Sequence, residues 1–157
     1  MRVLIVSQYF WPESFYLNDV VATLVKNGVE IDVLTGKPNY PEGKVFEGYR
    51  TWGCHWETWK GSNILRVPLF PRGQKSAWRL VANYLSFVIL GSLLGPWLLR
   101  KRQYDIVFGY GVSPILQTIP ALLIGRIKGC KIVSWVQDLW PESLKATGYI
   151  DNENLLG

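Results

Sequence analysis

MRVLIVSQYFWPESFYLNDVVATLVKNGVEIDVLT, residues 1–35, carries the patterns of a strand, a helix and a second strand in succession. Residues 2–10 form an apolar run typical of a buried strand in a parallel sheet. Between 14 and 27 the apolar residues recur on one helical face, and Gly28 is placed to end that helix in a left-handed conformation. Residues 29–33 alternate apolar with acidic side chains, which predicts a half-covered strand. Such a unit is right-handed and builds a parallel sheet.

The rest of the chain continues this alternation of strands and helices. The predicted segments are a loop at 36–50, a hairpin of 51–60 with 63–70, a helix at 76–99, a strand at 105–110, a helix from Ser113 to Gly129 that Pro120 kinks or restarts, and a buried strand at 130–136. The order indicates an α/β domain with an open, doubly wound, mainly parallel sheet of the Rossmann-like kind. We expect residues 1–157 to form one domain.

Composition and charge exclude several classes of protein. The chain has 48% hydrophobic residues, too many for a disordered segment. Its two cysteines, Cys54 and Cys130, lie far apart and His55 is its sole histidine, so we expect no structural metal site. The first residues lack the order of a signal peptide, and a reducing, cytosolic setting fits. The net charge is +5, but positions 58–104 hold eight basic and no acidic residues, so the basicity is local.

Three polar and aromatic segments follow predicted strands, at 11–18, 36–50 and 137–144. Because ligands of doubly wound sheets bind at the carboxyl ends of the strands, these segments predict a single cleft. The candidate ligand-binding residues in them are Glu13, Asn18, Asn39, Tyr40, Gln137, Asp138, Trp140 and Glu142.

Each of these candidates also has a structural interpretation. Asp138, Glu142 and Glu13 suit the amino end of a helix, where carboxylates cap or oppose the helix dipole. Asn18 lies off the apolar helix face, where it reaches either the cleft or solvent. The Asn39-Tyr40 pair, between two prolines, suits either a rigid turn or contact with a sugar.

Six motifs in these regions carry a family resemblance. They are FWPE at 10–13, LND at 17–19, LTGKPNYP at 34–41, VPLFPRG at 67–73, NYLSF at 83–87 and WVQDLWPES at 135–143. In this order the motifs resemble the start of retaining family 4 glycosyltransferases with the two-Rossmann-domain (GT-B) fold. They are most similar to the WbuB-like branch, whose members act in surface-polysaccharide and O-antigen assembly.

The resemblance implies that 1–157 is the amino-terminal, acceptor-binding half of such an enzyme. The implied acceptor is a saccharide on a polyprenyl diphosphate. The implied donor is a UDP-sugar carrying a hexose or N-acetyl deoxyhexosamine, held by a carboxyl-terminal domain outside this chain. Transfer is expected to need no metal or other cofactor. Asp138 is the implied catalytic residue, orienting the acceptor hydroxyl while the leaving phosphate takes its proton. The glycine pair that many relatives carry after the first strand is absent here.

The apolar segment 80–99 has three interpretations: a core helix, a helix lying on anionic lipid, or a membrane span. Basic residues and tryptophans at both ends favour surface contact over a span. The predicted membrane-contacting residues are Arg72, Lys75, Trp78, Arg79, Trp97, Arg100, Lys101 and Arg102. We therefore expect a cytoplasmic protein, peripheral on the inner face of the cell membrane. Nucleic acid is not an expected partner, because the basic residues are interleaved with apolar ones.

The sequence leaves two functions open, and they belong to different classes. One is the acceptor half of a glycosyltransferase, inactive without its donor half. The other is a non-catalytic α/β binding domain associated with a membrane.

Overall fold

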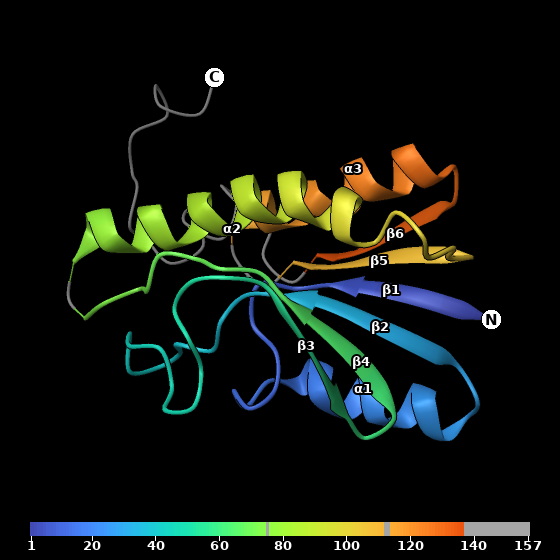
Figure 1. Cartoon of the computed structure of the whole chain (residues 1–157), viewed down its shortest axis with the longest axis horizontal. Helices are drawn as coiled ribbons and strands as arrows, with labels where there is room; N and C mark the ends of the chain where they lie inside the picture. The colour runs from blue at the N-terminus through green and yellow to red at the C-terminus, as the bar shows by residue number, and fades with distance from the viewer. Residues whose placement is uncertain (75, 112–113, 137–157) are drawn as a thin grey trace, which may run out of the picture.

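The computed structural model describes residues 1–74, 76–111 and 114–136, and these form a six-stranded α/β sheet (Figure 1). The strands are β1 (Arg2–Val6), β2 (Glu30–Thr35), β3 (His55–Trp59), β4 (Ser62–Arg66), β5 (Ile106–Gly111) and β6 (Lys131–Val136). Their order is β3-β4-β2-β1-β5-β6, and all neighbours are parallel except β3 and β4. The prediction of a mainly parallel, Rossmann-like α/β fold is confirmed.

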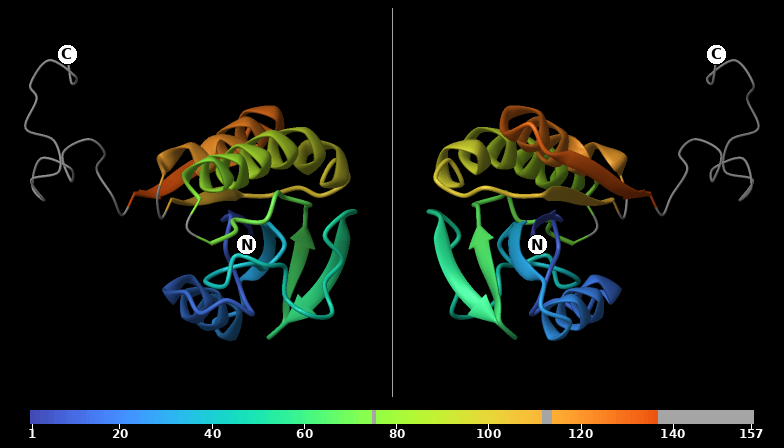
Figure 2. Two further views of the ribbon diagram at one scale, coloured as in Figure 1. Left: turned by 90° about the vertical axis from the view of Figure 1, so that its left-hand side faces the viewer. Right: turned by 90° about the vertical axis from the view of Figure 1, so that its right-hand side faces the viewer.

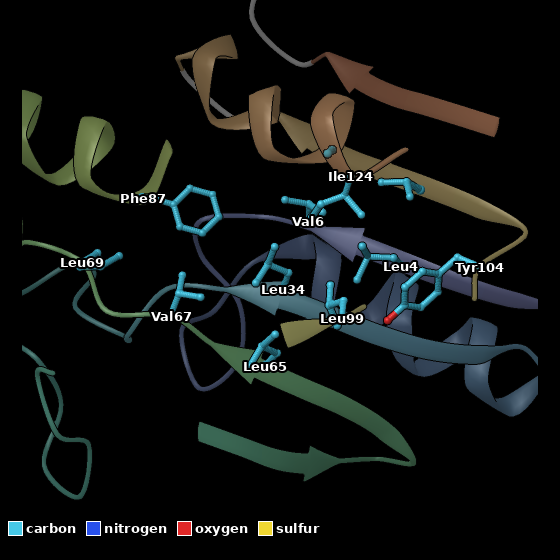
Figure 3. Close-up of a cluster of buried hydrophobic side chains, with 12 residues drawn as sticks. Leu4, Val6, Leu34, Leu65, Val67, Leu69, Phe87, Leu99, Tyr104 and Ile124 are labelled. Carbon is cyan, nitrogen blue, oxygen red and sulfur yellow. The ribbon is translucent and has the colours of Figure 1, made fainter. Parts of the chain in front are cut away.

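Helices cover both faces of this sheet (Figures 1 and 2). One face carries α1 (Tyr16–Lys26), and the other carries α2 (Ala77–Leu98), the short 3-10 helix η1 (Ile115–Thr118) and α3 (Ile119–Lys128). The alternation of β1 serves both layers, since Val3 and Ile5 pack in the α1 core while Leu4 and Val6 pack beneath α2 and α3. Figure 3 shows the second core, in which Phe87 and Ile124 come down from the two helices.

Local chemistry explains where the elements end. Gly28 has a φ of +80°, and Gly28 N and Val29 N donate to the carbonyls of Val25 and Leu24, so α1 ends in the predicted left-handed cap. The β3–β4 hairpin turns at Lys60 and Gly61, both with positive φ, which suits the twist of a two-residue turn. Pro120 lies at the first turn of α3 and therefore marks a restart rather than a kink.

The predictions for the first two strands need correction. The first strand ends at Val6 rather than residue 10, because Ser7 to Phe10 bend into the carboxyl edge and bond there. The second strand is buried on both faces rather than half-covered, and Asp32 is only 2% exposed. Hydrogen bonds that Asp32 accepts from Asn63, Arg102 and Tyr104 compensate for the burial of its carboxylate.

The last predicted strand is not buried among the described residues. β6 lies at the edge of the sheet beyond β5, and Val133, Trp135 and Val136 are 38–45% exposed. Its apolar sequence indicated burial on both faces, but the described helices cover the sheet only as far as β5 and part of one face of β6.

Candidate functional site

Three loops converge at the carboxyl edge of the sheet. They follow β1 (7–15), β2 (36–43) and β4 (67–73), and one buried side chain of α2 connects them. Asn83 Oδ1 accepts hydrogen bonds from Gln8 Nε2 at 2.6 Å and Tyr9 Oη at 2.9 Å. Asn83 Nδ2 donates to the Phe70 carbonyl at 2.7 Å and to Asn39 Oδ1 at 3.3 Å. All hydrogen-bonding groups of this amide are therefore used to fix the shape of the site.

Glu13 fixes the loop after β2. Its Oε1 accepts hydrogen bonds from Asn39 N at 2.8 Å and Tyr40 N at 2.7 Å, and its Oε2 accepts one from Phe10 N at 3.2 Å. The side chain is buried, and this burial raises the pKa of Glu13 to about 7, while the three N–H groups act in the opposite direction. The geometry gives Glu13 a positioning role, and its contact with substrate stays a prediction.

The two asparagines predicted to bind a ligand also form hydrogen bonds with backbone groups of the loops. Asn39 is fully buried: its Nδ2 donates to the Lys37 carbonyl at 2.9 Å, and its Oδ1 accepts from Arg72 N at 3.0 Å. Asn18, half-buried at the start of α1, accepts from Trp11 N and donates to the Glu13 carbonyl. Both side chains are placed to shape the loops that carry the half-buried aromatic rings and the arginine of the site.

Aromatic rings and one arginine form the accessible wall of the site. The rings of Tyr9 and Phe15 are stacked with centroids 5.4 Å apart, and the Tyr40 ring lies 5.6 Å from Tyr9 and 5.3 Å from Phe15. The Arg72 guanidinium lies 5.2 Å from the centre of the Tyr40 ring. Phe15, Tyr40 and Arg72 are half-buried, whereas Tyr9 is buried and its pKa is raised, chiefly by burial. Such a wall can stack against a sugar face and pair with an anionic group.

Arg72 has no acidic partner among the described residues, where the ion pairs are those of Arg2, His55, Arg66 and Arg102. Its position is set by the backbone bond to Asn39 and by stacking on Tyr40. The sequence groups Arg72 with the predicted membrane-contacting residues, whereas the structure puts it in the carboxyl-edge site.

A cavity of about 360 Å³ lies between the loop after β2 and the start of β3. It is lined by Lys37, Gly48, Arg50, Trp52, Gly53, Cys54 and His55. Lys37 Nζ and His55 Nδ1 are 2.7 Å apart, and burial lowers the pKa of both groups. Within the described ranges no three His, Cys, Asp or Glu side chains are grouped to hold a metal ion.

The structure brings together four of the predicted site residues: Glu13, Asn18, Asn39 and Tyr40. The predicted catalytic Asp138 and the predicted ligand-binding residues Gln137, Trp140 and Glu142 lie outside the described residues, as does Lys75. Of the remaining predicted membrane-contacting residues, Trp78, Arg79, Trp97, Arg100 and Lys101 are exposed. Arg102 has another partner, because its guanidinium pairs with Asp32 at 2.6 Å and lies 4.3 Å from the Trp56 ring centre.

Four residues of the site were not predicted from the sequence: Gln8, Tyr9, Phe15 and Asn83. Asn83 left a signal, because it is a polar residue inside an apolar helix and falls in line with Phe87, Gly91 and Gly95 on one face. Buried polar side chains of this kind need partners, which indicates a hydrogen-bond junction at that position. The other three lie in the stretch after β1 that was predicted partly as strand.

The fold and the loops at its carboxyl edge thus define a Rossmann-like α/β domain with a candidate ligand site at that edge of the sheet. No family model matches the chain. It is similar to the Escherichia coli (strain K12) protein "Putative colanic acid biosynthesis glycosyl transferase WcaI", with 27% identity over 153 residues. The match covers 94% of this chain and 37% of that protein, so the chain spans just over a third of its relative's length. The similarity supports a relationship to the glycosyltransferases.

Proposed function

We propose that this chain is the acceptor-side domain of a glycosyltransferase, whose carboxyl-edge site holds a saccharide linked to a diphosphate. The observation that carries the proposal is the pairing of half-buried aromatic rings with an arginine that has no acidic partner among the described residues. Phe15 and Tyr40 suit the apolar face of a sugar ring, and Arg72 suits a phosphate oxygen. The similarity to a protein described as a colanic acid biosynthesis glycosyl transferase supports a role in sugar transfer.

The donor half of the enzyme is proposed to lie outside these residues, forming the second domain of a GT-B fold. The share of the relative that this chain covers, 37%, supports a second domain of comparable or larger size. In this arrangement a UDP-linked hexose or N-acetyl deoxyhexosamine is bound opposite the carboxyl edge. Asp138 orients the acceptor hydroxyl, the leaving phosphate takes its proton, and no metal is required.

Binding measurements on the chain test this division of labour. We expect a short prenyl diphosphate carrying an N-acetylhexosamine to bind, and UDP-sugars to bind weakly or not at all, in calorimetric titrations. Arg72→Gln should weaken acceptor binding about tenfold or more, because it removes a charge-assisted contact. Lys26→Gln, which removes an equal charge from the end of α1, is the control and should leave binding unchanged.

Tight, stoichiometric binding of a UDP-sugar by this chain would overturn the proposed division. Equal acceptor binding by the Arg72→Gln and Lys26→Gln variants would remove the assigned role of Arg72. The alternative, a non-catalytic binding domain, predicts that the gene ends at codon 157. A further α/β domain encoded downstream, with sugar transfer by the longer protein, would exclude it.

A further inference from the structure

We infer that α2 and α3 together form a surface that lies flat on an anionic bilayer. The first observation is the outer face of α2. Its large apolar side chains are 45–67% exposed and recur every three or four residues along the helix: Trp78, Val81, Leu85, Ile89, Leu93 and Trp97. A soluble domain rarely leaves a continuous apolar stripe of this length in water, so the stripe indicates a docking surface.

The second observation is that α3 extends this surface. α3 packs beside α2 on the same face of the sheet (Figure 2), and it too turns apolar side chains outward. Ile119, Leu122, Leu123 and Ile127 are 38–61% exposed. The sequence predicted lipid contact only for 72–102, and the structure adds this second helix. The two exposed faces are hereafter called the helical plate.

The basic side chains around the helical plate indicate that the plate binds an anionic bilayer. Residues 76–136 hold seven basic residues and a single acidic one, Asp105, whose carboxylate accepts a hydrogen bond from Arg2 N away from the plate. Arg79 and Arg100 flank the two ends of α2 and lie 5.2 and 4.9 Å from the ring centres of Trp78 and Trp97. Lys101 and Arg126 are also exposed. Tryptophans and basic side chains around an apolar face are the pattern of helices that bind anionic lipid.

The inner face of α2 decides between lying on the bilayer and spanning it. By length and composition α2 is apolar enough to cross a membrane, since it has 22 residues and contains an 18-residue window with a mean hydropathy of 1.5. However, Asn83 on that face bonds Gln8, Tyr9 and Phe70, and Phe87 is fully buried in the sheet core. A span would expose these polar groups to hydrocarbon and empty the core, which costs several kcal/mol. The helix therefore lies in the plane of the interface.

The plate adjoins the carboxyl-edge site. The Trp78 ring at the amino end of α2 lies 5.7 Å from the Phe70 ring. Arg72, two residues after Phe70 in the sequence, stacks on Tyr40. If the proposed acceptor is correct, its prenyl chain can remain in the bilayer while its diphosphate reaches Arg72. This last step rests on the proposed function, whereas lipid binding by the plate does not.

Vesicle co-sedimentation of the chain tests the inference. We expect binding to phosphatidylcholine vesicles that contain phosphatidylglycerol, weaker binding without it, and release in alkaline carbonate. The double substitution Ile89→Glu with Leu93→Glu should lower partitioning about tenfold or more, because it charges the centre of the plate. Thr23→Glu with Lys26→Gln, on the exposed side of α1, changes the net charge by the same two units; it is the matched control and should bind like the unaltered chain.

A second pair of substitutions separates charge from apolar contact. Arg100→Gln with Lys101→Gln should reduce binding to anionic vesicles about fivefold for each charge removed, with little change on neutral vesicles. Circular dichroism should show unchanged folding, since all four substituted side chains are exposed. Because the vesicles contain no saccharide, failure of lipid binding is distinguishable from failure of acceptor binding.

Three outcomes would overturn the inference. Vesicle binding that survives Ile89→Glu with Leu93→Glu would place lipid contact elsewhere. A dimer in solution that the same substitutions dissociate, together with no vesicle binding, would assign the plate to a second copy of the chain. Resistance to carbonate extraction would show a span.

Discussion

Most helices of a soluble domain turn their large apolar side chains toward the core, but α2 turns several of its own outward. The inner face carries Asn83, Phe87, Gly91 and Gly95, whereas the outer face carries six large apolar side chains. Apart from Phe87, the fully buried residues of the inner face are small or hydrogen-bonded and let the helix lie close to the sheet, while the outer face holds the large apolar side chains that are exposed. Hydrophobicity alone therefore does not say which side of this helix is the core, and packing geometry does.

The inner face should be the sensitive one, and Asn83 its most sensitive residue. Asn83→Ala leaves Gln8 Nε2, the Tyr9 hydroxyl and the Phe70 carbonyl without their buried partner. We expect a loss of about 3 kcal/mol in the free energy of unfolding, measured by urea denaturation. Leu85→Ala, two positions along on the outer face, is the control. A smaller loss for Asn83→Ala than for Leu85→Ala would contradict the comparison.

Gly95 tests how closely α2 approaches the sheet. A Cβ at this position would lie 3.0 Å from side-chain carbons of both Leu34 and Ile124. Gly95→Val should therefore overpack the core and lower stability by about 2 kcal/mol, although valine suits a helix better than glycine. The same denaturation measurement applies, with Ser92→Val one turn away as the comparison. Unchanged stability would mean that the core beneath α2 has room to relax.

The fold was more predictable from sequence than the site, and the reason is physical. Strand and helix periodicities are local, so the β1–α1–β2 unit, the Lys60-Gly61 turn and the Gly129 stop follow from neighbouring residues. The site depends on bonds between distant residues, such as Asn83 with Gln8 across 75 positions. Glu13 could be selected as a candidate, but two of its three backbone partners, Asn39 and Tyr40, depend on how the loop after β2 folds back.

The carboxyl-edge network also predicts a pH dependence. Burial raises the folded-state pKa of Glu13 from 4.5 to about 7, so the folded chain holds this proton more tightly than the unfolded chain. The resulting stabilisation is complete below about pH 4.5 and is lost as pH rises through 7, by up to about 1.4 kcal/mol per pH unit. Glutamine at position 13 cannot titrate, so the free energy of unfolding of the unaltered chain, minus that of Glu13→Gln, should fall as pH rises from 5 to 8. A difference that grows over this range would show that the three N–H groups outweigh burial.

The smallest effect on stability is expected on the outer face of α2. Leu93 is 67% exposed, and glutamine is nearly as good a helix former as leucine. Leu93→Gln should therefore change the free energy of unfolding by less than about 0.5 kcal/mol in lipid-free buffer. The same substitution should weaken vesicle binding, since it removes one apolar side chain from the helical plate. A large loss of stability without lipid would mean that protein already covers this face, and the contrast between the two sides of α2 would disappear.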